Sequence, residues 1–98
     1  MRFPIVFRRA AKAEFYEACE WYESKRLGLS LDFIFEIDYC LSLVSQNPHQ
    51  YPFIHKDVRK VVVKRFPYCL YFRAENNRVV ILAIFHIKRD PEIWRKRT

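Results

Sequence analysis

His86 and Arg89 are the two residues of this sequence whose types and spacing are best suited to chemistry. His86 lies near the end of an apolar run, residues 78–87, and Arg89 lies just beyond that end. A histidine there can donate or accept a proton near neutral pH, beside an arginine that holds a phosphate or a carboxylate. A structural histidine, hydrogen-bonded to a backbone carbonyl, is the more usual occupant of a strand end, so both interpretations stay open.

A second set of candidates consists of basic and aromatic side chains around the same strands. Arginine and lysine hold anions, and aromatic rings beside them can stack on bases or pack against a partner. Ion pairs and core packing are the alternatives: Arg65 can pair with Asp57 or Asp90, and Trp94 can cover the open end of the sheet. The candidates for target binding are Arg59, Lys64, Arg65, Tyr68, Arg73, Arg89 and Trp94.

The charge of the chain is concentrated in its second half. Residues 1–54 contain six Lys and Arg against seven Asp and Glu, and residues 55–98 contain twelve against four, which gives −1 and +8 of the total of +7. This distribution predicts a polyanion or an acidic protein as the partner. We expect the cations to share the face of the sheet that the helices leave open, although the sequence does not tell which basic row of residues 58–64 lies there.

Four segments are predicted as strands. Residues 58–64, 68–75 and 78–87 are rich in β-branched and aromatic residues, with Pro67 at the first corner and the hairpin-forming pair Asn76-Asn77 at the second. Residues 2–9 form a short strand that we expect beside residues 78–87, because the latter are apolar on both alternations, as in a central strand.

Two amphipathic helices lie between the first two strands. The first begins at Ala10 and closes with Lys25-Arg26, with Gly28 as its stop, and the second begins near Ser30 as the N-cap and ends at Asn47-Pro48. Residues 48–57 are predicted as a loop whose apolar side chains tuck beneath the sheet; these are Tyr51, Phe53 and Ile54. The predicted fold is a single α+β domain over residues 1–98, β-α-α-β-β-β, with the helical hairpin packed on one face of a mainly antiparallel four-stranded sheet.

Several classes of protein are disfavoured by composition. Cys19, Cys40 and Cys69 are widely spaced among apolar neighbours, which predicts buried free thiols rather than disulfides or zinc ligands. The three histidines also lack metal-ligand spacing, so no metal or cofactor is expected. We see no membrane span and no signal peptide, and we expect a cytoplasmic protein.

The order of these elements and three segments of the chain resemble the RelE/ParE superfamily of bacterial type II toxins, on its ParE-like side. The segments are Val58-Arg59-x-x-x-Val63, Arg65-Phe66-Pro67-Tyr68 and His86-x-x-Arg89-Asp90-Pro91-x-x-Trp94. The resemblance covers essentially the whole chain. It implies a toxin that arrests growth and that a cognate antitoxin neutralises.

The resemblance leaves three functions open. ParE-like members poison DNA gyrase, which requires no catalytic set, and we favour this function. RelE-like members are ribosome-dependent endoribonucleases that cleave mRNA; here the catalytic residues would be His86, Arg89, Arg65 and Arg59. This chain departs from the ribonucleases in having Tyr71 as its last tyrosine. A non-toxic binding module is the third possibility, and a toxin homodimer and a heterotetramer with the antitoxin stay open as assemblies.

Overall fold

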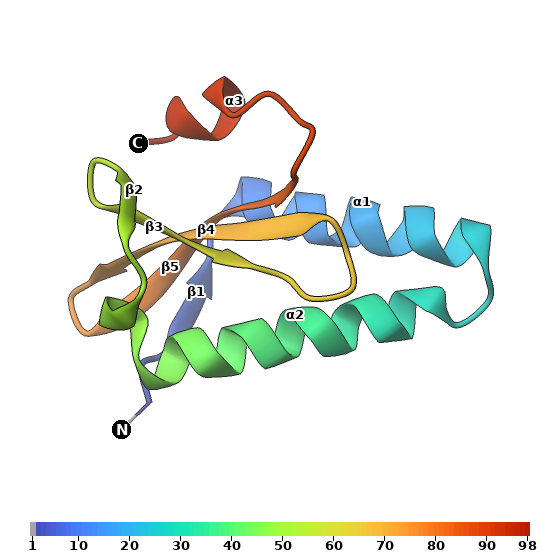
Figure 1. Ribbon diagram of the computed structural model, residues 1–98, viewed down its shortest axis with the longest axis horizontal. Coiled ribbons are helices and arrows are strands. Elements are labelled where there is room, and N and C mark those ends of the chain that lie inside the picture. The colour runs from blue at the N-terminus through green and yellow to red at the C-terminus, as the bar shows by residue number, and fades with distance from the viewer. Residues whose placement is uncertain (1) are drawn as a thin grey trace.

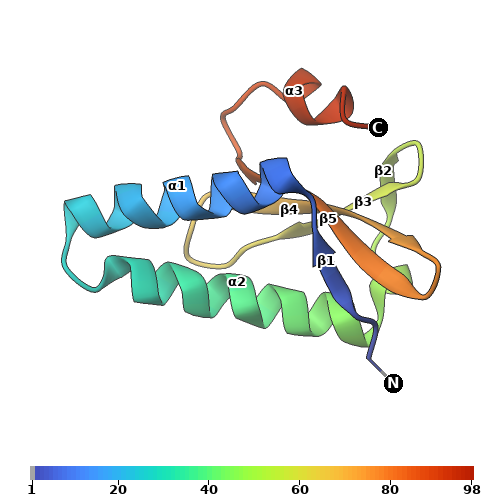
Figure 2. The ribbon, with the colours of Figure 1, turned by 180° about the vertical axis from the view of Figure 1, so that it is seen from behind.

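The computed structural model of the chain describes residues 2–98. A long helical hairpin covers one face of a sheet, and a short C-terminal helix lies on the other face (Figures 1 and 2). The strands are β1 (Ile5–Phe7), β2 (Phe53–His55), β3 (Val58–Val62), β4 (Tyr68–Glu75) and β5 (Arg78–His86). The helices are α1 (Arg9–Lys25), α2 (Leu29–Gln46) and α3 (Glu92–Arg95), and a single 3-10 turn spans Pro48–Gln50.

The sheet confirms the predicted fold class but contains five strands rather than four. Its order is β1-β5-β4-β3-β2, with β1 parallel to β5 and the other pairs antiparallel. The expectation that the first strand pairs with the last is therefore confirmed. The additional strand is β2, which lies within the segment predicted as a loop. It has only three residues and an irregular register with β3, which explains why it gives no strand pattern in the sequence.

The two tight connections have clear local causes. Asn76 and Asn77 both have positive φ, 51° and 60°, as the predicted hairpin requires. At the α1–α2 turn, Gly28 has φ 85° and is the N-cap of α2, so the prediction of Ser30 as the N-cap is wrong. The Ser30 hydroxyl instead donates to Glu23 Oε1 at 2.6 Å.

Glu23 of α1 takes over the capping of α2. Its carboxylate accepts the backbone N–H groups of Gly28 at 2.9 Å and Ser30 at 3.1 Å. These are amide groups at a helix N-terminus, which have no partner within the helix. The Gly28 amide, followed by the Ser30 hydroxyl and amide, lowers the pKa of Glu23. One acidic side chain thus joins the last turns of α1 to the first turn of α2.

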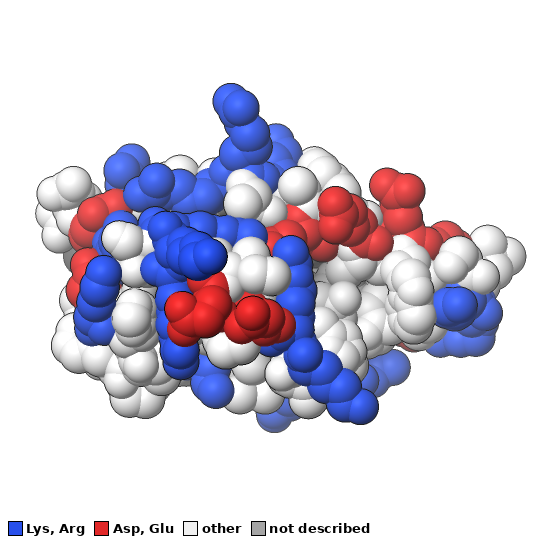
Figure 3. Space-filling model, turned by 90° about the horizontal axis from the view of Figure 1, so that it is seen from above, with Lys and Arg blue, Asp and Glu red and all other residues white. Residues whose placement is uncertain are grey.

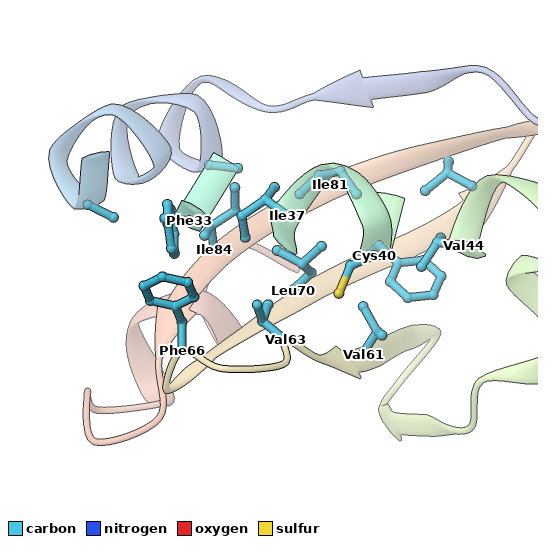
Figure 4. Packing of buried hydrophobic residues seen from close by; sticks show 14 of the residues in the cluster. Phe33, Ile37, Cys40, Val44, Val61, Val63, Phe66, Leu70, Ile81 and Ile84 are labelled. Atoms are coloured by element: carbon cyan, nitrogen blue, oxygen red, sulfur yellow. The ribbon is translucent and has the colours of Figure 1, made fainter. Parts of the chain in front are cut away.

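The main core lies between the helical hairpin and the sheet. Phe33, Ile37, Cys40 and Val44 recur on α2 at three- and four-residue steps and point at side chains of the strands (Figure 4). The Phe33 ring is completely buried and meets the rings of Phe66 and Tyr68 edge-on, with centroids 5.2 and 5.1 Å away. The hairpin is therefore held by an aromatic cluster near the β3–β4 connection.

A second, smaller core lies on the opposite face of the sheet. Trp94 of α3 is buried and stacks on Tyr71, with ring centroids 4.2 Å apart. Its neighbours in this cluster are Val58, Val80, Leu82, Ala83 and Phe85. Trp94 therefore covers an apolar face of the sheet, and β5 is buried on both faces, as a central strand should be.

The segment after α2 differs from its prediction. Tyr51 is half-buried and packs on the main core, but the side chains of Phe53 and Ile54 are 59% and 39% exposed. The expectation that both tuck beneath the sheet is wrong, because β2 is an edge strand whose side chains extend past the core. No helix formed by residues 2–98 is both long and apolar enough to cross a bilayer.

Candidate functional site

Three of the predicted site residues meet in one cleft. Tyr68, His86 and Arg89 line a hollow of about 570 Å³ between α1 and the adjoining ends of β4 and β5. We call this hollow the α1–β5 cleft. Its remaining lining residues are Glu14, Glu17, Ala18, Trp21, Tyr22, Pro67 and Ile84.

A β-bulge places His86 in this cleft. Phe72 is paired with Ile81 but Tyr71 with Ala83, so Leu82 is an additional residue in β5. In a regular ladder, the register set by the Phe72–Ile81 pair would place Phe85 opposite Tyr68, and His86 would lie on the other face of the sheet. With the bulge, His86 pairs with Tyr68 and their rings are in edge contact, 5.4 Å between centroids.

The bulge is held by a buried carboxylate. Glu14 of α1, which is 8% exposed, accepts the Ile84 N–H at 3.1 Å on Oε1. It also forms ion pairs with Arg89 at 2.9 Å and Arg97 at 2.8 Å. Arg97 in turn donates to the Leu82 carbonyl at 3.0 Å. Since the bulge interrupts the ladder, these contacts supply partners for its backbone groups and also tie the C-terminal tail to α1.

The side chains of the cleft have defined proton positions. His86 Nδ1 accepts the Lys88 N–H at 3.1 Å, so the proton of the neutral ring is on Nε2. Burial, and next the neighbouring Tyr22, raise the pKa of Tyr68, so its phenol is protonated at neutral pH. Arg89 is held by Glu14 and by the ring of Phe85, 4.4 Å from the guanidinium carbon. The cleft therefore presents N–H and O–H donors.

The other predicted cations are distributed among separate anchor points. Arg59 lies on the helix side of β3 and donates to the carbonyls of His49 and Tyr51, while its guanidinium covers the ring of Phe53. Arg65 pairs with Glu36 at 3.3 Å and Asp32 at 3.7 Å. The predicted pairing of Arg65 with Asp57 or Asp90 is therefore wrong.

The remaining candidates also have structural neighbours. Arg73 Nε lies 2.9 Å from Asp57 Oδ2, in an ion pair whose N–H is not aligned with the oxygen. Lys64 is exposed, 6.0 Å from the ring centroid of Tyr39. The expectation of one shared cationic face is wrong for two reasons. Part of the sheet face opposite the hairpin is apolar and covered by Trp94. Arg59, Arg65 and Arg89 bind three different segments of the chain.

Glu14 and Trp21 line the cleft but are not among the residues predicted from the sequence. Glu14 interrupts the buried stripe of α1, which consists of Ala11, Ala18 and Tyr22, and an acid at a stripe position is a detectable signal. Trp21 is 55% exposed on the rim of the cleft, and nothing in the helical pattern distinguishes it. Within residues 2–98, no group of three or more His, Cys, Asp or Glu is arranged to hold a metal ion.

Of the comparisons with known proteins, the one with solved structures gives a match. No family model and no curated protein matches this chain. Among solved structures, it is similar to a chain described as "Chromosomal ParDE TA system from P. aeruginosa", with a TM-score of 0.74 and 21% identity. The likeness covers 87% of this chain and 96% of that one. The chain therefore has a ParE-like toxin fold, as the resemblance of its sequence implies.

Proposed function

We propose that this protein is the toxin of a type II toxin–antitoxin system, which arrests growth by binding an essential target and is neutralised by a cognate antitoxin. The observation that carries the proposal is the likeness in fold to a chain of a ParDE system, which spans nearly all of both chains. DNA gyrase is the favoured target, because the sequence resemblance is to ParE-like members of the superfamily.

The geometry of the charged residues supports binding rather than catalysis. Cleavage of a phosphodiester requires an acid, a base and cations around one phosphate. Of the four residues proposed for that role, only His86 and Arg89 share a site, and Arg89 is already paired with Glu14. Arg59 and Arg65 are bound to other segments. An inhibitor that acts through surface contacts needs no such assembly.

Controlled expression in a bacterial host tests the proposal. Induction of the chain is expected to lower viable counts, and co-expression of a short acidic reading frame adjoining the gene is expected to restore growth. Arg78→Gln changes one exposed cation at the β4–β5 turn, outside the α1–β5 cleft, and should remain toxic. Unchanged growth, with the protein detected by immunoblot in the soluble fraction, would exclude the toxin function and favour the non-toxic binding module.

A ribosome-dependent endoribonuclease is the second candidate. The observation that favours it is the meeting of Tyr68, His86 and Arg89 in one cleft, with Glu17 as a further carboxylate. Primer extension on translated messages would detect cleavage, and His86→Ala would abolish it. The binding function predicts instead that no new message ends form while growth stops.

A further inference from the structure

We propose that the outer face of α2 pairs two copies of this chain in an antiparallel dimer. The surface consists of Leu31, Phe35 and Tyr39, which are 69%, 65% and 46% exposed, and we call it the α2 ridge. Leu27, in the turn just before α2, is 88% exposed and extends the apolar surface. The inference goes beyond the proposed function and does not depend on it.

The α2 ridge is unusual for a helix at the surface of a protein. The solvent side of such a helix is ordinarily polar, and a helix that is apolar all round is ordinarily buried. One side of α2 packs into the main core through Phe33, Ile37 and Val44, and the helix contains no Lys or Arg. In Figure 1, α2 runs along the lower edge of the molecule. Two sides of α2 are thus apolar, and within residues 2–98 only one of them is covered.

The spacing of the α2 ridge makes it self-complementary. Its three side chains stand four residues apart, so they form one ridge along the helix, of the kind that packs against a second helix. Phe35 is the midpoint of this ridge. When a second copy lies antiparallel with the two-fold axis at Phe35, the two Phe35 rings meet, and Leu31 of each copy meets Tyr39 of the other. Every member of the ridge then has an apolar partner.

The charges beside the ridge favour the antiparallel arrangement. Asp32 follows Leu31 at one end of the ridge, and the Lys64 ammonium lies 6.0 Å from the ring centroid of Tyr39 at the other end. Both charges lie on the side of the β3–β4 connection, because Arg65 of that connection pairs with Asp32 at 3.7 Å. Antiparallel copies bring Lys64 of each next to Asp32 of the other, whereas parallel copies would set like charges opposite each other.

The positive charge of the chain does not oppose this pairing. Residues 1–54, which contain both long helices, have a net charge of −1, and residues 55–98 have +8. Lys and Arg gather around α3 (Figure 3), which lies on the other face of the sheet from α2 (Figure 1). An acidic antitoxin is attracted to that side, so a second copy is the occupant that suits a helix without Lys or Arg. The dimer leaves the α1–β5 cleft open, because no lining residue of the cleft belongs to α2.

Sedimentation equilibrium of the purified chain measures the pairing. The mass should rise with concentration from 12.0 kDa toward twice that value. One pair of helices is a small interface, so the dissociation constant should be on the order of 10 µM. Phe35→Asp sets two carboxylates against each other on the two-fold axis and should weaken the dimer at least about tenfold. Phe53→Asp is the matched control, because that ring is 59% exposed on β2, and it should leave the dimer unchanged. Both variants should keep the circular dichroism spectrum of the unmodified chain.

Single cysteine substitutions test the geometry of the pair. Helices in contact have axes about 8–10 Å apart and Cα atoms about 2.3 Å from each axis, so facing Cα atoms come within the range of a disulfide. Phe35→Cys should cross-link two copies on mild oxidation, because residue 35 meets its own counterpart. Leu31→Cys alone should not, whereas a mixture of Leu31→Cys and Tyr39→Cys chains should. The unmodified chain, oxidised in the same way, is the control for its own three cysteines.

Three results would overturn the inference. The first is a mass that stays at 12.0 kDa up to concentrations of about 1 mM. The second is a dimer that Phe35→Asp leaves intact or that Leu31→Cys alone cross-links. The third is a monomeric chain whose binding to the antitoxin is weakened by Phe35→Asp, since the antitoxin would then be the occupant of the ridge. Growth arrest by the unmodified chain is measured separately, so a failure of the proposed function is distinguishable from a failure of the dimer.

Discussion

Replacement of Glu14 by glutamine should destabilise the protein far more than a typical charge change on a helix. Removing one partner of a buried ion pair costs about 3–5 kcal/mol. Arg89 and Arg97 are 43% and 22% exposed, so water compensates part of the loss and about 2–3 kcal/mol remains. A domain of this size has a free energy of unfolding of roughly 5–15 kcal/mol. The melting temperature should therefore fall by about 10–20 °C.

Urea unfolding followed by circular dichroism and tryptophan fluorescence measures this loss. Glu17→Gln is the matched control, because Glu17 is exposed three residues further along the same helix and should change the free energy of unfolding by no more than about 0.5 kcal/mol. Equal unfolding midpoints for Glu14→Gln and Glu17→Gln would refute the structural role of the Glu14 cluster. A double-mutant cycle with Arg97→Gln would then measure the coupling of the C-terminal tail to α1.

Three further predictions concern the core, pH and the thiols. Phe33→Ala should lower the free energy of unfolding measured in urea by about 3–5 kcal/mol. Phe35→Ala truncates a side chain that is 65% exposed on the same helix and should have little effect. Similar losses in both variants would contradict the packing of α2. Hydrogen bonds from Gly28 and Ser30 lower the pKa of Glu23 in the folded protein. The ionised Glu23 therefore stabilises the fold above its ordinary pKa of about 4.3, and this stabilisation is lost as the pH falls through the pKa of Glu23 in the folded protein. The unfolding midpoint of the unmodified protein should thus fall more steeply below pH 4.3 than that of Glu23→Gln, and parallel curves would argue against this capping contact. Burial raises the pKa of Cys40 and Cys69, so iodoacetamide at neutral pH should modify them rapidly only in denaturant, and fast modification of the folded protein, detected by mass spectrometry, would be inconsistent with this burial.

The fold could be predicted well because its signals are local. The period of apolar residues changes from two to about four between the strands and helices, and Asn76-Asn77 tolerates the positive φ of a tight hairpin. The pairing of β1 with β5 followed from the apolar character of the last strand. β2 was missed because three residues beside a stronger neighbour form a strand only through tertiary pairing.

The site could be predicted only in part, because its geometry depends on one unpaired residue. Leu82 looks like any apolar residue in a strand, yet as a bulge it moves His86 to the face of Tyr68. The Arg65 pairing was predicted wrongly because it joins the β3–β4 connection to α2, segments whose relative position the sequence does not encode locally. Glu14 connects segments 70 or more residues apart, and such a contact is visible only after folding.

Titration of the purified chain into a DNA gyrase supercoiling reaction distinguishes a toxin that binds gyrase from one that cleaves messages. A toxin that acts by binding should inhibit supercoiling in proportion to its concentration and should saturate near equimolar amounts, with relief on addition of the antitoxin. Full supercoiling activity at excess toxin, together with new message ends in primer extension, would contradict gyrase binding and establish a ribonuclease instead.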